Sequence, residues 1–314
     1  MKNIAVIGAG VIGLTSALRL LEKGFTVTIF ARDIYDNITS RAAPALWVPF
    51  RAHPEELIIK WGRRSREVYL TLPESSGVVL MDVVEFRKAH EDIPLWAKML
   101  EHHGEAPADQ LPPGYTQSFT ASIHKIDSSL FVDYLLDKVQ ERGGKIIQQY
   151  IPAISQIDAA FPLIINCSGV WSHQLVPDPG SFPIKGQYLV TEKPPGLNKI
   201  SLASGDTECC TLVAPRSRDC YISGTAIDHD WNTHPDEKVT RLLFENALAL
   251  EPLLANVNIL RSGIGLRPGR KAVRLESEEL EDGRMVIHNY GHGGAGFATA
   301  WGCAEEVVGL ALKI

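Results

Sequence analysis

The sequence predicts an α/β fold in which two outer α/β segments enclose a β-rich middle. The first observation is the run Gly8-Ala9-Gly10-Val11-Ile12-Gly13, which follows an apolar strand at residues 4–7 and opens a helix. The second is another strand of the fully buried type, at residues 162–169, which also ends in a glycine. The third is a series of short β-runs over residues 184–227, typical of an antiparallel sheet. A discontinuous cofactor domain with an inserted substrate domain follows most simply.

Each glycine of the first motif has a physical reason. One turns the chain sharply, one lets a pyrophosphate approach the backbone, and Gly13 lets the helix pack closely on the strand. The helix N-terminus then offers N–H groups and partial positive charge to phosphates. A second strand at residues 25–30 completes the unit, so we predict a dinucleotide site. Arg32 and Asp33 follow that strand, and they do not decide which cofactor binds. A carboxylate accepts hydrogen bonds from the ribose hydroxyls of NAD or FAD, whereas an arginine pairs with the 2′-phosphate of NADP or lies on an adenine.

The other elements follow from periodicity and from the placement of Pro and Gly. Pro44 and Pro49 make residues 42–50 a rigid extended segment. We expect helices over residues 54–69, 93–103, 128–142, 236–250 and 296–312, strands over 78–86 and 145–149, and loops over 32–41 and 107–115. The expected cofactor domain comprises residues 1–75, 128–180 and 260–314, and the expected substrate domain comprises 76–127 and 181–259.

Composition narrows the function classes. The chain has 314 residues, 45% apolar content and a net charge of −6, which fits a globular protein and argues against a nucleic-acid partner. A basic cluster at residues 60–66 is the local exception, and we interpret it as the solvated face of an amphipathic helix. No apolar run approaches the ~20 residues that a membrane helix needs.

The five cysteines indicate a cytoplasmic protein with reduced thiols, since none forms a CxxC pair or a zinc-binding spacing. We therefore expect no metal site. The apolar N-terminal residues belong to the first strand and the glycine loop, and no signal-peptide cleavage site follows them. The last residues, 310–314, do not form a peroxisomal Ser-Lys-Leu signal.

The tail Val286-Ile287-His288-Asn289-Tyr290-Gly291-His292-Gly293-Gly294-Ala295-Gly296, continuing to Trp301-Gly302-Cys303-Ala304, closely resembles the signature of the D-amino-acid oxidase family. The resemblance continues, in the family's order, at residues 42–50, 166–171, 177–179, 185–187 and 265–270. It therefore spans nearly the whole chain. It implies a glutathione-reductase-like FAD-binding Rossmann domain with an inserted β-rich substrate domain, and FAD as the cofactor.

The resemblance also implies which residues contact FAD. The glycines of the first motif would hold the pyrophosphate, Arg32 would lie by the adenosine, and Ser40 with Arg41 would reach the phosphates. From the residues alone, the loop at 293–296 can present backbone N–H groups to the pyrimidine edge of a flavin or can simply cap a helix. Ala298 stands where the family has a threonine, which is displaced to Thr299. The full implied set is Gly8, Gly10, Val11, Ile12, Gly13, Arg32, Asp33, Ser40, Arg41, Ala42, Ala43, Ala45, Leu46, Trp47, Ser168, Gly169, Val170, Gly293, Gly294, Ala295, Gly296, Phe297, Ala298 and Thr299.

The implied chemistry depends on Arg267. Its guanidinium offers two parallel N–H donors that match the carboxylate of an α-amino acid, although an arginine can also form a surface ion pair. With the amine held by the carbonyl of Gly294, the substrate Cα–H would point at flavin N5. The family transfers this hydride without a side-chain base, so His288 and His292 would hold the loop by hydrogen bonds. By the same reasoning Tyr290 would pack under the glycine loop, and Arg270 and Arg274 are expected to be structural.

The sequence departs from the family before Pro215. Where mammalian members place tyrosines that cover the substrate, this chain has Glu208 and Leu212, and Tyr221 is the nearest remaining tyrosine. Glu208 is either a solvated loop residue or a partner for a cationic substrate side chain. Two arginines nearby, Arg216 and Arg218, do not match the extra arginines of aspartate-specific members position for position.

The sequence therefore predicts an FAD-dependent oxidase of D-amino acids that yields 2-oxo acids, ammonia and hydrogen peroxide. The alternatives are a glycine or secondary-amine oxidase, a D-aspartate oxidase, an NADP-linked dehydrogenase favoured only by Arg32, and a non-catalytic flavin-binding protein. The expected partners are a D-amino acid and molecular oxygen, with no nucleic acid and no membrane. Related members are often homodimers, so we keep a homodimer open.

Overall fold

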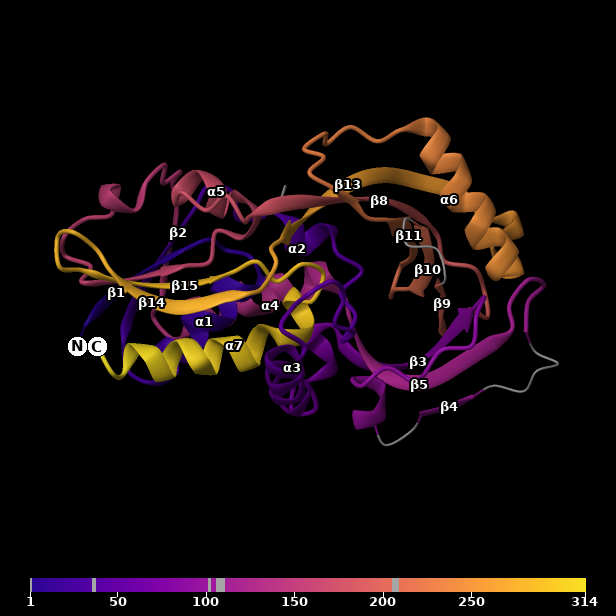
Figure 1. Cartoon of the computed structure of the whole chain (residues 1–314), viewed down its shortest axis with the longest axis horizontal. Coiled ribbons are helices and arrows are strands. Elements are labelled where there is room, and N and C mark those ends of the chain that lie inside the picture. The colour runs from indigo at the N-terminus through magenta and orange to yellow at the C-terminus, as the bar shows by residue number, and fades with distance from the viewer. Residues whose placement is uncertain (1, 36–37, 101–102, 106–110, 205–208) are drawn as a thin grey trace. The chain divides into compact units, whose positions relative to one another are not determined.

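The structure, a computed structural model, describes residues 2–35, 38–100, 103–105, 111–204 and 209–314. The chain divides into two compact units (Figure 1). The first unit comprises Met1–Val78, Ser128–Pro183 and Arg267–Ile314, and the second comprises Val79–Asp127 and Ile184–Leu266. Each unit is therefore assembled from segments that are far apart in the sequence.

The first unit is built on a six-stranded sheet of order β14-β15-β7-β1-β2-β6. All its strand pairs are parallel except β14–β15, and Ile4 of β1 pairs with Val27 on one side and Leu163 on the other. Every described residue of β1 after Asn3, and all of β7, is buried, which is typical of a parallel sheet covered on both faces. The strands are β1 Asn3–Ile7, β2 Thr26–Ala31, β6 Lys145–Gln148, β7 Leu163–Asn166, β14 Arg274–Glu279 and β15 Met285–Tyr290.

Helices of the first unit pack on one another beside this sheet. The long C-terminal helix α7 contacts α1 and α3, and α1 also contacts α4. The opposite face of the sheet carries Ala5 and Ile7, which pack against Ile151, Ile154 and Ile157. The helices are α1 Val11–Glu22, α2 Thr39–Ala42, α3 Glu55–Tyr69, α4 Ser128–Glu141, α5 Ser172–Leu175 and α7 Gly296–Ala311.

The second unit is built on a nine-stranded, mainly antiparallel sheet with the order β12-β8-β11-β10-β9-β3-β5-β4, in which β13 also pairs with β8. Helix α6, Glu237–Leu250, covers one face; its Leu243 and Ala247 pack against Leu189, Val213 and Ile222. Asp236 caps α6 by accepting from the N–H of Lys238 at 2.7 Å. The strands are β3 Val78–Arg87, β4 His103–Glu105, β5 Gln117–Ile126, β8 Phe182–Glu192, β9 Ile200–Ser204, β10 Cys209–Pro215, β11 Asp219–Thr225, β12 Ile227–Asp228 and β13 Ile259–Gly269.

The predicted α/β class is confirmed, and so are the helices predicted over residues 54–69, 128–142, 236–250 and 296–312. The helix predicted over residues 93–103 is wrong. The described part contains only a 3₁₀ turn, Ala97–Met99, before β4. Pro94 disfavours a helical backbone at Ile93, the first residue of the predicted helix. The single turn is enough to bury the apolar residues Ala97 and Leu100, so the apolar spacing does not require a longer helix. The loop predicted over residues 32–41 also needs correction, because α2 begins at Thr39.

Candidate flavin site

The glycine motif forms a tight turn between β1 and α1. Gly8 has a φ of +111°, and a Cβ there would lie 2.4 Å from the carbonyl oxygen of Cys167. A Cβ on Gly13 would lie 1.9 Å from the carbonyl oxygen of Gly8, so helix and turn touch through backbone atoms. Any side chain at either position would displace backbone. The sequence explanation of these two glycines is therefore confirmed in geometric detail.

The N-terminus of α1 faces Ser40. The N–H of Val11 donates to the Ser40 hydroxyl at 2.9 Å, and α1 begins at Val11 with Gly10 as its N-cap. The N–H groups of Ile12 and Gly13 have no partner within the helix, because the first turn of any α-helix leaves its donors unpaired. These donors and the Ser40 hydroxyl meet at the carboxyl end of β1. That is the end at which open α/β sheets bind nucleotides.

Arg41 lies beside Ser40 on α2 and is tied to helix α4. Its guanidinium pairs with the carboxylate of Asp133 and points a second nitrogen at the carbonyl of Ser129, 3.5 Å away. Its Nε is buried and has no hydrogen-bond partner within the described ranges. The side chain therefore retains one unused donor near the N-terminus of α1.

The cofactor ambiguity at the end of β2 is reduced by the contacts of Arg32. Its Nε donates to Asp33 Oδ2 at 2.7 Å, and its guanidinium lies 4.3 Å from the ring centre of Trp171. A 2′-phosphate would have to compete with Asp33 for this cation. The guanidinium lies over the Trp171 ring, next along the chain to Val170, which is 3% exposed. Trp171 belongs to the motif at residues 166–171, but nothing in the sequence pattern pairs it with Arg32.

Strand β7 ends at the same edge of the sheet as β1. Asn166 accepts from both the N–H and the hydroxyl of Ser168, at 3.2 and 2.6 Å, and its amide lies 3.2 Å from His288 Nδ1. Gly169 follows with a φ of +62°. Ser168 and Gly169 are thus fixed in a turn directly beside the Gly8 turn.

The segment after α2 is anchored through Trp47. Its indole N–H donates to the carbonyl of Gly62 at 2.9 Å, and its side chain is 1% exposed. Ala45 adopts a φ of +49° just before it. Trp47 is therefore a core side chain packed toward α3, whereas Ala42, Ala43 and Leu46 are among the half-buried residues of this segment.

The glycine loop before α7 differs from the expectation in one respect. We expected residues 293–296 to present their N–H groups outward, but three are already used. The N–H of Gly293 donates to Pro268, that of Gly294 to Phe50 and that of Ala295 to His292, at 2.8 to 2.9 Å. The donors without an intrahelical partner are those at the start of α7, on Gly296, Phe297 and Ala298. Thr299 is fully buried, and its hydroxyl donates to the carbonyl of Ala295 at 2.9 Å.

Arg267 and Gly294 lie against the same aromatic ring. The guanidinium carbon of Arg267 is 5.7 Å from the ring centre of Phe50. A Cβ on Gly294 would lie 2.7 Å from Phe50 Cδ1, so this glycine packs directly on the ring. The structure thus brings together the two residues predicted to hold the substrate, and Phe50 is the contact that the sequence reasoning left out. In the sequence, the place of Phe50 in the motif at residues 42–50 is the one sign that this residue belongs to the site.

The histidines of the tail have different surroundings. His288 lies between Asn166 and Glu278, with Nε2 3.1 Å from the Glu278 carboxylate, as expected for a residue that holds the loop. His292 does not match this expectation. It is 1% exposed, its Nε2 has no hydrogen-bond partner in the described part of the chain, and burial lowers its pKa to about 3. His292 is therefore a neutral imidazole in this structure.

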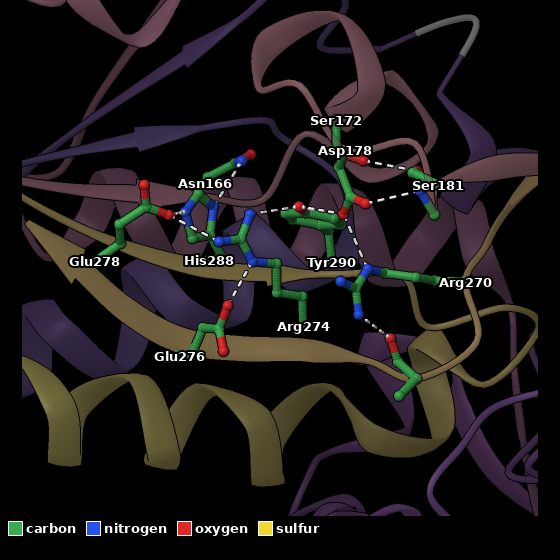
Figure 2. Close-up of polar contacts among 12 residues, drawn as sticks. Asn166, Ser172, Asp178, Ser181, Arg270, Arg274, Glu276, Glu278, His288 and Tyr290 are labelled. Atoms are coloured by element: carbon green, nitrogen blue, oxygen red, sulfur yellow. Dashed lines mark hydrogen bonds and ion pairs between the residues drawn. The ribbon is translucent and has the colours of Figure 1, made fainter. Parts of the chain in front are cut away.

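Tyr290, Arg270 and Arg274 form a buried polar cluster, shown in Figure 2. The Tyr290 hydroxyl donates to Asp178 Oδ2 at 2.7 Å and accepts from Arg274 at 3.0 Å. Arg270 donates to the same Asp178 oxygen at 2.9 Å. Each arginine pairs with a carboxylate of the protein, Arg270 with Asp178 and Arg274 with Glu276 and Glu278, in agreement with their expected structural role.

Two of the predicted substrate residues lie in the second unit. The pairs Leu212–Ser223 and Ala214–Tyr221 place Leu212 and Tyr221 on the face of the sheet opposite α6. Tyr221 is 3% exposed and stacks on Tyr188 with ring centres 5.0 Å apart. Glu208 lies outside the described residues.

The basic residues near the β10–β11 turn are also accounted for. Arg216 is buried and forms a two-pronged ion pair with Asp219, at 2.6 and 2.8 Å. The burial disfavours its charge, but the Asp219 carboxylate outweighs this and raises the pKa of Arg216. Arg218 is exposed. Arg216 therefore already has a carboxylate partner within the protein.

Comparison with known proteins decides the family. A family model described as "FAD dependent oxidoreductase" matches residues 3–310. The chain belongs to this family. It is 38% identical to a D-amino-acid oxidase of Rubrobacter xylanophilus over 99% of this chain and 96% of that protein. It is 35% identical to one from Streptomyces coelicolor, over 98% and 96%, and 30% identical to the human D-aspartate oxidase, over 98% and 94%.

Solved structures support the fold of this FAD-dependent oxidoreductase. A glycine oxidase from Bacillus cereus superposes with a TM-score of 0.83, covering 100% of this chain and 95% of the other, at 17% sequence identity. An L-proline dehydrogenase from P. horikoshii gives a TM-score of 0.80 at 17% identity, with coverage of 99% and 93%. At this identity the similarity concerns the fold alone.

The residues of the first unit fit the FAD of this family. Gly8 and Gly13 leave a backbone-lined turn that a Cβ would fill, and Ser40 sits at the N-terminus that would face a pyrophosphate. The buried, unpaired Arg41 Nε and His292 Nε2 provide polar atoms that a bound ligand can satisfy. Among the described residues, no three His, Cys, Asp or Glu side chains are grouped to hold a metal ion. In the same residues, no helix combines the length and apolar character needed to cross a bilayer.

Proposed function

We propose that this FAD-dependent oxidoreductase carries out the oxidative deamination of D-amino acids. The observation that carries the proposal is that Arg267, on β13, and Gly294, just before α7, both lie against Phe50. The relatives named D-amino-acid oxidases, at 34 to 38% identity over nearly the whole chain, support the same reaction. We assign the binding of FAD and of the substrate's carboxylate and amine to the first unit.

Arg267 is the proposed carboxylate-binding residue. Its two parallel N–H donors match the two oxygens of a carboxylate, which a single ammonium group cannot do. The guanidinium carbon lies 5.7 Å from the centre of the Phe50 ring, within the range at which an aromatic ring attracts a cation. The amino acid is therefore held by a part that every substrate shares, in one orientation.

Gly294 is the proposed amine-binding residue, through its carbonyl oxygen. The loop that carries this carbonyl is fixed, because the neighbouring N–H groups of Gly293, Gly294 and Ala295 all donate to backbone carbonyls. An amino acid held at its carboxylate and at its amine has only two places left for its hydrogen and its side chain. The requirement that the Cα–H point toward the flavin is the third constraint, and it selects one handedness of the substrate.

FAD, when bound, supplies the electrophilic N5 that accepts a hydride. The chain's own residues align the Cα–H bond and bind the amino acid with a neutral amine; no side-chain base is required in this proposal. In the net reaction, a D-amino acid, oxygen and water give a 2-oxo acid, ammonia and hydrogen peroxide. The neutral His292 takes no proton in this scheme, in keeping with its low pKa of about 3.

The test is the visible spectrum of the purified protein, without oxygen, before and after addition of D-alanine, D-lysine, D-aspartate, glycine and the L-forms. We expect bleaching of the flavin band by D-forms. Bleaching by glycine alone would support the alternative amine-oxidase function. A flavin band that no amino acid bleaches would overturn the proposal.

The role of Arg267 is tested by Arg267→Lys. The substitution keeps the charge but removes the two-pronged geometry, so about one charge-assisted hydrogen bond of ~1.5–3 kcal/mol is lost and KM rises about 10- to 100-fold. Arg261→Lys is the matched control, since Arg261 lies on the same strand and also stands over an aromatic ring, 5.8 Å from that of Tyr188. Equal KM values for the two variants would refute the assignment.

D-Aspartate is a secondary candidate substrate, because the human D-aspartate oxidase is among the relatives. Arg216 would be the nearest match to an extra arginine, but Asp219 already pairs with it. We therefore place acidic D-amino acids below neutral ones, and the ranking in the bleaching experiment tests this order.

The setting of the protein is part of the proposal. We propose that the substrate partners are a free D-amino acid and oxygen, that the active form is a homodimer, and that the protein works in the cytoplasm. Buried free thiols at Cys167, Cys220 and Cys303 support a reducing compartment. Light scattering after gel filtration tests the homodimer, and cell fractionation tests the location.

A further inference from the structure

Asp178 joins two segments of the first unit that lie far apart in the sequence. Its Oδ2 accepts hydrogen bonds from Arg270 Nε at 2.9 Å and from the Tyr290 hydroxyl at 2.7 Å. Its Oδ1 accepts from the N–H of Gly180 at 2.9 Å, which fixes the rotamer of the carboxylate. Figure 2 shows both side chains converging on Asp178. One buried carboxylate thus holds the end of β13 and the end of β15 together.

The two donors of Asp178 carry the segments on which the proposed substrate contacts lie. Arg270 is three residues after Arg267, and Tyr290 is four residues before Gly294. The stem of Arg270 packs on Gly291, where a Cβ would lie 2.9 Å from Arg270 Cβ and 3.0 Å from Cδ. A backbone hydrogen bond between Gly293 and Pro268, 2.8 Å long, joins the segments at a further point.

The charges within this cluster make the carboxylate difficult to replace. Asp178 and the Tyr290 ring are buried, and Arg270 is the only cation that forms an ion pair with Asp178 among the described residues. Burial alone would disfavour the charged carboxylate, but the hydrogen bonds from Tyr290, Arg270 and Gly180 outweigh it and lower the pKa of Asp178. Removal of the charge leaves a partly buried guanidinium without its counter-ion.

We propose that Asp178 is a positioning residue for amino-acid recognition, because it sets the spacing between the Arg267 guanidinium and the Gly294 carbonyl. The inference rests on the proposed function, in which these two groups bind the carboxylate and the amine of one substrate. Asp178 acts through Arg270 and Tyr290 and does not itself touch the amino acid. A ligand that uses both binding groups depends on the spacing, whereas a ligand that uses only Arg267 does not.

The test compares D-alanine with propionate, which has the same carboxylate and carbon chain but no amine. In the FAD-loaded Asp178→Asn variant we expect kcat/KM for D-alanine to fall about 10- to 100-fold, since a misplacement near 1 Å has an effect of that order. The inhibition constant of propionate should change less than about threefold, because propionate needs Arg267 alone. A purely structural role would lower the thermal midpoint and leave both constants of the folded enzyme unchanged.

Asp282→Asn is the matched control. Asp282 also pairs with an arginine, Arg284, at 2.8 Å, but it precedes β15 whereas Tyr290 ends that strand. Its constants should equal those of the wild type. Tyr290→Phe is the second variant, which removes one donor to Asp178 and keeps the ring. It keeps the inference testable if Asp178→Asn does not fold, and a several-fold loss confined to D-alanine is expected.

Four outcomes are decisive. A loss for D-alanine that propionate does not share supports the inference. Unchanged constants in both variants, or equal losses for the two ligands, overturn it. Failure of the wild type to oxidise any D-amino acid would instead overturn the proposed function, which the wild-type measurement shows before any variant is compared.

Discussion

The contact between α3 and α7 leads to a sharp stability prediction. Gly302 lies in α7 where a Cβ would meet backbone, 2.4 Å from both the Cα and the carbonyl oxygen of Trp61. An ordinary contact is about 1 Å longer, so Gly302→Ala forces the two helices apart. The same contact includes the Ser65 hydroxyl, which accepts from the N–H groups of Trp301 and Gly302, each at 3.1 Å.

The magnitude follows from three contributions. Overpacking costs about 1–3 kcal/mol, and a weakened Ser65 hydrogen bond about 1 kcal/mol more. The higher helix propensity of alanine returns about 1 kcal/mol. The net loss is about 1–3 kcal/mol, which lowers the thermal midpoint by about 2–6 °C in a chain of this length.

The assay is thermal unfolding at saturating FAD, with Gly309→Ala as the matched control in the same helix. A Cβ on Gly309 would meet nothing within 4 Å. The control should therefore gain up to about 1 kcal/mol from helix propensity and raise the midpoint slightly. Equal shifts in the two variants, or a Gly302→Ala protein as stable as the wild type, would refute the reasoning.

Three further predictions concern the cofactor, pH and thiols. Gly13→Ala places a methyl group 1.9 Å from the Gly8 carbonyl, so the FAD dissociation constant measured by fluorescence should rise about 100-fold; an unchanged constant would show that the turn does not bind FAD. The folded-state pKa of His292 is lowered to about 3, so below pH ~6.5 the unfolded state binds a proton that the folded state does not. The free energy of unfolding therefore decreases as the pH is lowered, by about 2 kcal/mol between pH 6.5 and pH 5. His292→Gln should remove this pH dependence from denaturation curves. Burial raises the pKa of the Cys303 thiol well above its usual value, so iodoacetamide at pH 8 should label the half-buried Cys210 first, as read by peptide mass spectrometry; faster labelling of Cys303 would contradict the buried placement.

Local signals in the sequence were sufficient for the parallel core. Strand β7 was predictable because an uninterrupted apolar run must be buried on both faces, and Gly13 because only a glycine permits backbone contact with the Gly8 turn. The segment at residues 93–103 misled the prediction, because apolar spacing over so short a stretch does not separate a helix from a turn packed on a sheet. Strand β5 was missed because its serines and threonines obscure the alternation.

The sequence motifs single out the residues of the candidate site but not the contacts among them. Arg267 and Gly294 stay predictions from their motifs, whereas their shared contact with the Phe50 ring depends on a distant loop. Spacing along a chain does not determine which residues meet when sequence separations are this large. The N–H groups of the glycine loop are a second example. The sequence suggests that the N–H groups of Gly293 and Gly294 are free to bind a ligand, but in the structure they donate to the backbone carbonyls of Pro268 and Phe50.

The proposed contacts to FAD and the proposed contacts to the amino acid belong to the same compact unit. In the proposed function Arg267 and Gly294 bind the carboxylate and the amine, which every amino acid shares, and Asp178 acts through Arg270 and Tyr290 on the segments that carry them. Substitutions at Asp178 or Arg267 should therefore affect all amino-acid substrates together.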